Sequence, residues 1–168
     1  MKRPQPEEYS SFHSTYIDKV DDNVLSELTD QLVSFPEFLA TIPVAKTDYA
    51  YADGKWTIKE LLGHIIDTER IMSYRLLRFA RNDSTSLPGF EENDYVRNAH
   101  FNNQEFNGMI KEFEAVRKAN LFLFKSLTEE ELQRKGTASN ATLSVRALLF
   151  IIAGHLKHHQ KVILEKYL

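Results

Sequence analysis

The amino-acid sequence predicts an all-α protein, a four-helix bundle with one long crossover connection and a short extra helix. Two observations support this prediction. Apolar residues recur at helical spacing through most of the 168-residue chain, and no segment shows the alternating pattern of a strand. Turn residues without a sustained period fill residues 82–103, between two periodic segments. We expect residues 1–168 to form a single domain, because a chain of this length usually builds one core.

The first long helix follows an N-terminal arm that contains prolines. Asp22 is the expected N-cap, because a short side-chain oxygen there can accept a bond from the first helical turn. One apolar face follows at helical spacing, formed by Val24, Leu25, Leu28, Leu32 and Phe35. Pro36 should kink or divide this helix, and Pro43 should end its continuation.

The second helix has a clear start. Thr57 and Glu60 have the spacing of a capping box, and Trp56 precedes them, where it can pack back on the helix as part of a staple. The periodic segment then continues to about Arg81. The connection after it, residues 82–103, is long enough to be a lid, a binding loop or a crossover.

Two more helices and one short helix are expected after the connection. The third long helix should occupy about 103–127, and its apolar residues exceed what one face can bury. Thr128 and Glu131 form a second capping box, which opens a short helix that Gly136 should stop. The last helix should run from about Ser144 to Tyr167.

Composition excludes several classes of protein. The chain has no cysteine, which rules out disulfides, thiolate zinc sites and cysteine nucleophiles. A formal net charge of −3 predicts no general attraction to nucleic acid or to an anionic membrane. The N-terminus lacks the apolar segment of a signal peptide, and the longest apolar run, ALLFIIAG, is far below the ~20 residues of a membrane span. We therefore expect a soluble, cytoplasmic protein.

The stretch GHLKHHQKV, residues 154–162, contains three histidines. His155 and His159 are four residues apart, so they share one helix face and could bind the same metal ion. His158 is one position off this face and should lie at the rim. Such a pair is more often solvated or packed in a core than metal-binding, and zinc normally takes at least three protein ligands.

His64 in the second helix can supply the third ligand. Gly63–His64 and Gly154–His155 repeat the same dipeptide, although glycine inside a helix costs ~1 kcal/mol relative to alanine. One explanation is tight packing alone. The other is a close approach of the two helices that brings His64 to His155 and His159. His13 in the arm and His100 in the connection are interpreted as surface residues.

Three segments together carry a family resemblance: GKWTIKELLGHIIDTERIMSYRLLRFARND, then LPGF, then VRALLFIIAGHLKHHQKVI. The whole chain resembles the DinB-like superfamily of metal-binding four-helix bundles, named for damage-inducible proteins and distinct from the polymerase that shares the name. In that family one histidine of the second helix and two of the fourth bind a divalent metal, commonly nickel or zinc. The resemblance therefore implies His64, His155 and His159 as metal ligands, and it implies frequent pairing into homodimers.

Three neutral imidazoles leave coordination positions open, and open sites bind water or substrate. Three functions follow: transfer of a low-molecular-weight thiol to a small electrophile, hydrolysis by a water held at the metal, or binding without catalysis. We rank thiol transfer slightly above hydrolysis, because no carboxylate is clearly placed as a general base. Asp67, three residues after His64, is the one weak candidate for a base or for a partner of a ligand. We expect a small-molecule substrate and a homodimer.

Overall fold

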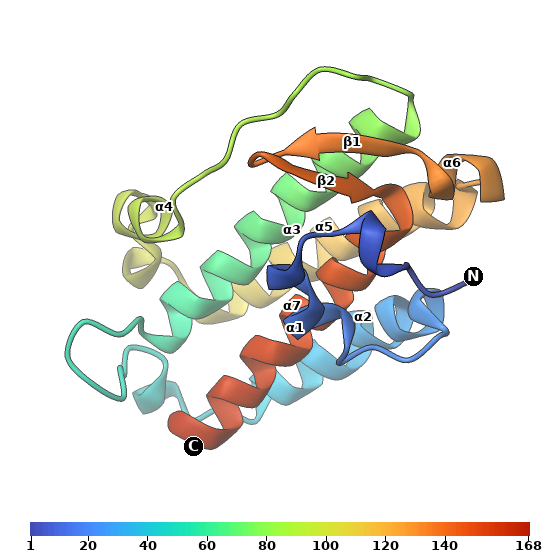
Figure 1. Cartoon of the computed structure of the whole chain (residues 1–168). Helices are drawn as coiled ribbons and strands as arrows, with labels where there is room; N and C mark the ends of the chain where they lie inside the picture. The colour runs from blue at the N-terminus through green and yellow to red at the C-terminus, as the bar shows by residue number, and fades with distance from the viewer.

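The computed structural model describes all residues, 1–168. Four long helices dominate it (Figure 1): α2 (Val24–Ala40), α3 (Ile58–Ala80), α5 (Phe106–Ser126) and α7 (Val145–Lys166). Helix α3 packs against α5 and α7, and α2 packs against the same two helices, so that α2 and α3 are diagonal neighbours. The predicted four-helix bundle is confirmed. No helix combines the length and the apolar character that crossing a bilayer requires.

The predicted helix starts agree with the structure at three places. The Thr57 hydroxyl accepts a bond from the Glu60 amide at 3.2 Å, and the Glu60 carboxylate accepts one from the Thr57 amide at 2.7 Å. Thr128 and Glu131 repeat this capping box at the start of α6 (Glu129–Gln133). Ser144 caps α7 by accepting a bond from the Ala147 amide at 3.0 Å. Local side-chain chemistry therefore sets where these helices begin.

The first long helix departs from the prediction. Asn23, not Asp22, occupies the N-cap position, and its side chain makes no capping bond. Pro36 lies inside α2, which continues to Ala40 without division. Phe35 and Leu39 on either side of the proline are fully buried, so tertiary packing holds the last turn in place. Pro43 precedes the short 3-10 helix η3 (Val44–Lys46).

A small antiparallel hairpin precedes α7 and was not predicted. Strands β1 (Lys135–Ala138) and β2 (Ala141–Ser144) are joined by Ser139 and Asn140, which both have positive φ, at 52° and 61°. Gly136 does not stop α6, which ends at Gln133. It lies in β1 against the ring of Phe79, where an added Cβ would stand 2.1 Å from the ring atoms.

The long connection from α3 to α5 is confirmed, but it is not without structure. It contains α4 (Glu92–Ala99) and the 3-10 helix η4 (Phe101–Asn103). Its first part pairs with the hairpin, because the Leu87 amide donates to the Thr137 carbonyl at 2.9 Å. Figure 1 shows this segment rising over the hairpin before it descends to α4.

The N-terminal arm packs across α7 (Figure 1). It contains two 3-10 turns, η1 (Pro6–Glu8) and η2 (Ser11–His13), followed by the single turn α1 (Ser14–Ile17). The arm is fixed by a buried Glu8 carboxylate, which accepts a bond from the Arg146 guanidinium of α7 at 2.8 Å. The arm is therefore anchored to the start of α7.

A polar layer divides the core into two apolar clusters. Each long helix contributes to it, through Gln31 of α2, Glu69 of α3, Arg117 of α5 and the Ala153 carbonyl of α7. Arg117 is fully buried and donates to both carboxylate oxygens of Glu69, at 2.7 and 2.9 Å. One apolar cluster contains Phe79 and Phe124 on one side of the layer, and the other contains Phe35 and Phe113 on the other side.

Candidate metal centre

The structure brings His64, His155 and His159 together in the core of the bundle. The Nε2 atom of His155 lies 3.0 Å from that of His64 and 3.0 Å from that of His159. One nitrogen of each ring lies within 4.8 Å of the others. His155 and His159 are on successive turns of α7, and the packing of α3 against α7 places His64 beside them.

The cluster fits a divalent metal ion. Three nitrogens bound tetrahedrally at ~2.0–2.1 Å would lie about 3.3 Å apart, close to the two contacts of 3.0 Å. Burial lowers the pKa of His64 to about 4 and the pKa of His159 to about 3. Burial, and then the neighbouring imidazoles, hold the pKa of His155 well below its ordinary value. All three rings are thus neutral at neutral pH, which is the state that coordinates a metal.

Two aromatic side chains cover the histidines from different segments. The Trp56 ring centroid lies 4.8 Å from that of His64, and the Tyr16 ring meets His155 edge-on at 5.4 Å. Tyr16 belongs to the N-terminal arm, so the arm forms part of the wall. Sequence reasoning did not find this role, because only the tertiary contact with α7 places the arm there.

Gly63 and Gly154, the glycines beside His64 and His155, were expected at a close contact between α3 and α7. Both instead contact other segments of the chain. A Cβ at Gly63 would lie 2.5 Å from the ring of Phe101, which belongs to the connection. A Cβ at Gly154 would lie 2.1 Å from the backbone oxygen of Tyr16 in the arm. The nearest neighbours of both glycines thus come from segments other than α3 and α7. They make room for the two segments that pack on the outside of this helix pair.

The remaining histidines lie outside the cluster. His158 is half-buried, with its ring 4.9 Å from that of His159 and 5.6 Å from that of Tyr16. It lines a cavity at the edge of the cluster, in agreement with the expected place at the rim. His100 is exposed, as expected, whereas His13 is half-buried and its Nδ1 lies 2.8 Å from the Ser10 hydroxyl.

The polar residues that follow His64 along α3 have other partners. Asp67 lies 3.6 Å from Arg70 and makes no hydrogen bond or ion pair with the three histidines. It lines a separate hollow with residues of α4, and burial raises its pKa. Arg75 donates to the Pro88 carbonyl at 2.9 Å and so holds the connection to the bundle. Arg78 pairs with Asp83.

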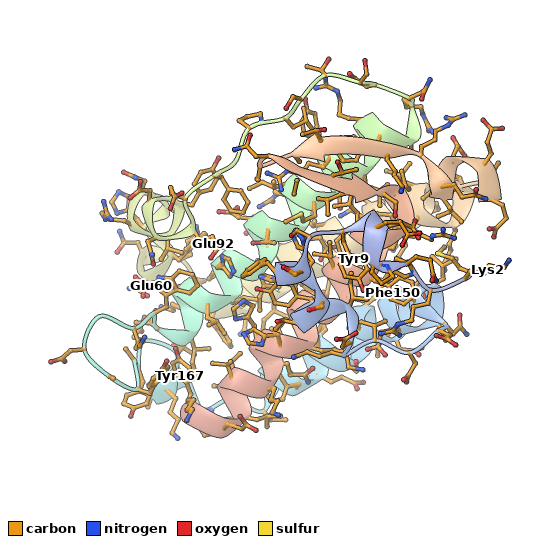
Figure 2. All side chains as sticks on the ribbon, viewed as in Figure 1. Lys2, Tyr9, Glu60, Glu92, Phe150 and Tyr167 are labelled. Atoms are coloured by element: carbon orange, nitrogen blue, oxygen red, sulfur yellow. The ribbon has the colours of Figure 1, made fainter.

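A cavity of about 290 Å³ opens beside the cluster. Its walls come from the segment before α3, from the first turns of α3, from α4 and from the end of α7. The lining residues are Tyr51, Gly54, Lys55, Trp56, Leu61, Asn93, His158, His159, Val162 and Tyr167. Figure 2 shows Tyr167 at the end of α7, on the side of the molecule where α3 begins. Asn93 belongs to α4, so the long connection reaches the pocket and forms part of its wall.

Solved structures share this fold. YfiT from Bacillus subtilis, described as a probable metal-dependent hydrolase with an unusual four-helix bundle topology, superposes with a TM-score of 0.71 at 17% identity, over 98% of this chain and 91% of YfiT. A mycothiol-dependent maleylpyruvate isomerase gives a TM-score of 0.68 at 11% identity, over 90% of this chain and 62% of the isomerase. A DinB-like protein of B. subtilis, YjoA, gives 0.59 at 21% identity, over 84% and 86%.

Sequence comparison agrees with the structural one. A protein of Oceanobacillus iheyensis, whose name proposes a metal-dependent hydrolase, is 28% identical over 110 residues, which are 65% of this chain and 63% of that relative. The match thus spans less than two thirds of the relative's own length. The sequence model of the DinB superfamily matches residues 27–163, which include all three clustered histidines and leave out most of the arm. The chain therefore belongs to the DinB superfamily.

Proposed function

We propose that this protein is a metal-dependent enzyme that acts on small molecules, with a divalent ion, nickel or zinc, held by His64, His155 and His159. The observation that carries the proposal is the convergence of three neutral imidazole nitrogens at the wall of a cavity. A cluster kept only for packing has no need of an adjacent cavity. The names of the relatives, which speak of metal-dependent hydrolases, support the same class of chemistry.

We further propose that the reaction is the transfer of a low-molecular-weight thiol to an electrophile. The bound ion would supply Lewis acidity, and with three neutral ligands its positive charge would favour a small anion such as a thiolate. In the transfer the thiol proton leaves to solvent, a sulfur–carbon bond forms, and the leaving group departs with the electron pair of the bond that breaks. The chain has no cysteine, so the thiol must enter as a cosubstrate.

Hydrolysis is the second candidate, and the relatives' names favour it. A hydrolase is assisted by a general base within hydrogen-bond reach of the attacking water. Asp67, the carboxylate considered for this role, pairs with Arg70 and lines a different hollow. Its position is the reason for ranking thiol transfer first.

The test compares turnover with and without a thiol in the metal-loaded protein. We expect conversion of a chloro-nitroarene to require both the metal and a small thiol, and to be lost in His64→Ala. The nickel or cobalt form should also change its visible absorption when the thiol is added. Turnover of esters or amides without thiol would instead establish the hydrolase. A protein that binds metal but shows neither reaction would be a binding module.

A further inference from the structure

The cavity beside the histidines has flat, aromatic walls. Tyr51 and Tyr167 meet edge-on with ring centroids 5.0 Å apart, and the Trp56 ring leads from there to His64. Leu61 and Val162 complete the apolar lining. At about 290 Å³ the cavity is at the lower end of the volumes typical of small-molecule sites.

These walls are held in place by a hydrogen bond between the two ends of the cavity. The Tyr167 hydroxyl donates to the Trp56 carbonyl at 2.7 Å and so ties the end of α7 to the segment before α3. Burial, with Tyr51 and Glu60 nearby, raises the pKa of Tyr167 to about 12, so the phenol is neutral. A fixed, uncharged aromatic wall favours a flat apolar ligand, since rings pack best on planar groups.

Lys55 supplies the one formal charge among the lining residues. Three lysines of the chain form ion pairs, among them Lys59 with Asp48 at 3.1 Å and Lys157 with Glu27 at 3.2 Å. Lys55 forms none, and its side chain makes no hydrogen bond within the protein. Its ammonium is therefore available to an anionic group of a ligand, and the Asn93 amide lines the same cavity with further donors.

We infer that this cavity binds the acceptor substrate, and that the acceptor is a small molecule with a planar apolar body and one carboxylate or similar anion, held by Lys55. The role of the ligand as acceptor rests on the proposed function, whereas its binding in this cavity does not depend on turnover. The ring of such a ligand lies against Trp56 and Tyr167, in the cavity that His159 also lines.

Trp56 is the only tryptophan in the chain, so its fluorescence reports occupancy of the cavity directly. The probes are para-nitrobenzoate and the neutral para-nitrobenzamide, titrated into the zinc-loaded full chain. We expect saturable quenching by both, with the carboxylate bound about three- to fivefold more tightly, which is the size of one solvent-accessible ion pair. Lys55→Gln should abolish this preference. Lys125→Gln, an exposed lysine at the end of α5, should leave it unchanged.

Two outcomes overturn the inference. One is equal binding of the amide and the carboxylate by the unaltered protein. The other is a preference for carboxylate that survives in Lys55→Gln, which would mean that the metal or another group holds the anion. The proposed function fails separately: if the preference depends on Lys55 but no thiol-dependent turnover is found, the binding site stands and thiol transfer does not.

Discussion

Gly154 lies directly against the backbone carbonyl of Tyr16, so closely that a Cβ at residue 154 would stand 2.1 Å from that oxygen. This contact docks the N-terminal arm on α7 one residue before His155. It also sets the Tyr16 ring edge-on to both His155 and His158. The glycine that looked like a helix-packing residue in the sequence therefore positions a third segment over the candidate metal centre.

Gly154→Ala should displace the arm. We expect a loss of about 1–3 kcal/mol in the free energy of unfolding, because the added methyl group overpacks a backbone contact that cannot move aside locally. Chemical denaturation measures this loss. Gly108→Ala is the matched control, since its Cβ would meet only ordinary contact at 3.7 Å and alanine favours α5 by up to about 1 kcal/mol. Equal effects of the two substitutions would contradict the account of Gly154.

Metal loading should depend on the three clustered histidines and not on the nearby His158. His155→Ala is expected to abolish binding of about one divalent ion per chain, because its Nε2 is the atom that contacts both other rings. His158→Ala should leave loading nearly intact. The metal content of each variant after dialysis, measured by atomic emission, tests both expectations. A protein that needs His158 and not His155 would show that the ligand set is wrong.

Removing one partner of the buried Arg117–Glu69 ion pair should lower the free energy of unfolding much more than replacing both partners. Arg117→Met leaves the Glu69 carboxylate buried without its partner, so we expect a loss of about 3–5 kcal/mol in unfolding free energy. Replacing Glu69 by leucine in the same protein should recover much of that loss. Lys118→Met, at the exposed neighbouring position, is the control and should stay within about 0.5 kcal/mol. A double variant no more stable than Arg117→Met would refute the argument.

The Glu8–Arg146 pair should make stability depend on pH. Burial opposes ionisation of Glu8, but hydrogen bonds from Arg146 and from the Gln5 amide outweigh it and hold the pKa below its ordinary value. A lowered folded-state pKa gives stability that is present above the unfolded pKa, about 4.3, and is lost as the pH falls through the folded-state value. Glu8→Gln should therefore destabilise most near neutral pH and least in acid. Glu7→Gln, the exposed neighbour, should show no such trend.

The surface of α5 leads us to expect a homodimer. Phe122 is 75% exposed and Val33 of the adjacent α2 is 58% exposed, whereas Leu121 and Phe124 are buried. Both side chains line hollows between α2 and α5, and large exposed apolar side chains commonly mark interfaces. Light scattering at micromolar concentration should give the dimer mass, and Phe122→Glu should give the monomer. A monomer mass for the unaltered protein would contradict this prediction.

The parts of the fold that sequence could predict are those set by local chemistry. The capping boxes at Thr57 and Thr128 and the long periodic faces determine the helices within a few residues. The hairpin was missed because its strands have four residues each, too few for alternation to register, and because Ser139–Asn140 is not one of the common glycine-containing turn pairs. Pro36 does not divide α2, because burial of its neighbours outweighs its local cost.

Some residues of the candidate site could likewise be predicted from the sequence, and others could not. Helical spacing put His155 and His159 on one face, and the tertiary packing of α3 and α7 then brings His64 to them. Nothing in the local sequence of Tyr16, Lys55 or Asn93 marks them as wall residues, because each reaches the cavity only through contacts between distant segments. The place of Asp67 depends on the rotation of α3 and on α4, a helix that the sequence did not reveal.

His64 and His155 approach each other across 91 residues of chain. An ion held by both would be a covalent-like cross-link that closes a very long loop, in a protein without cysteines to form a disulfide. Unlike a disulfide, the ion would be released on unfolding, so it would stabilise the bundle by the free energy with which it binds the folded chain. The same three imidazoles would then also hold α3 and α7 together in the folded bundle.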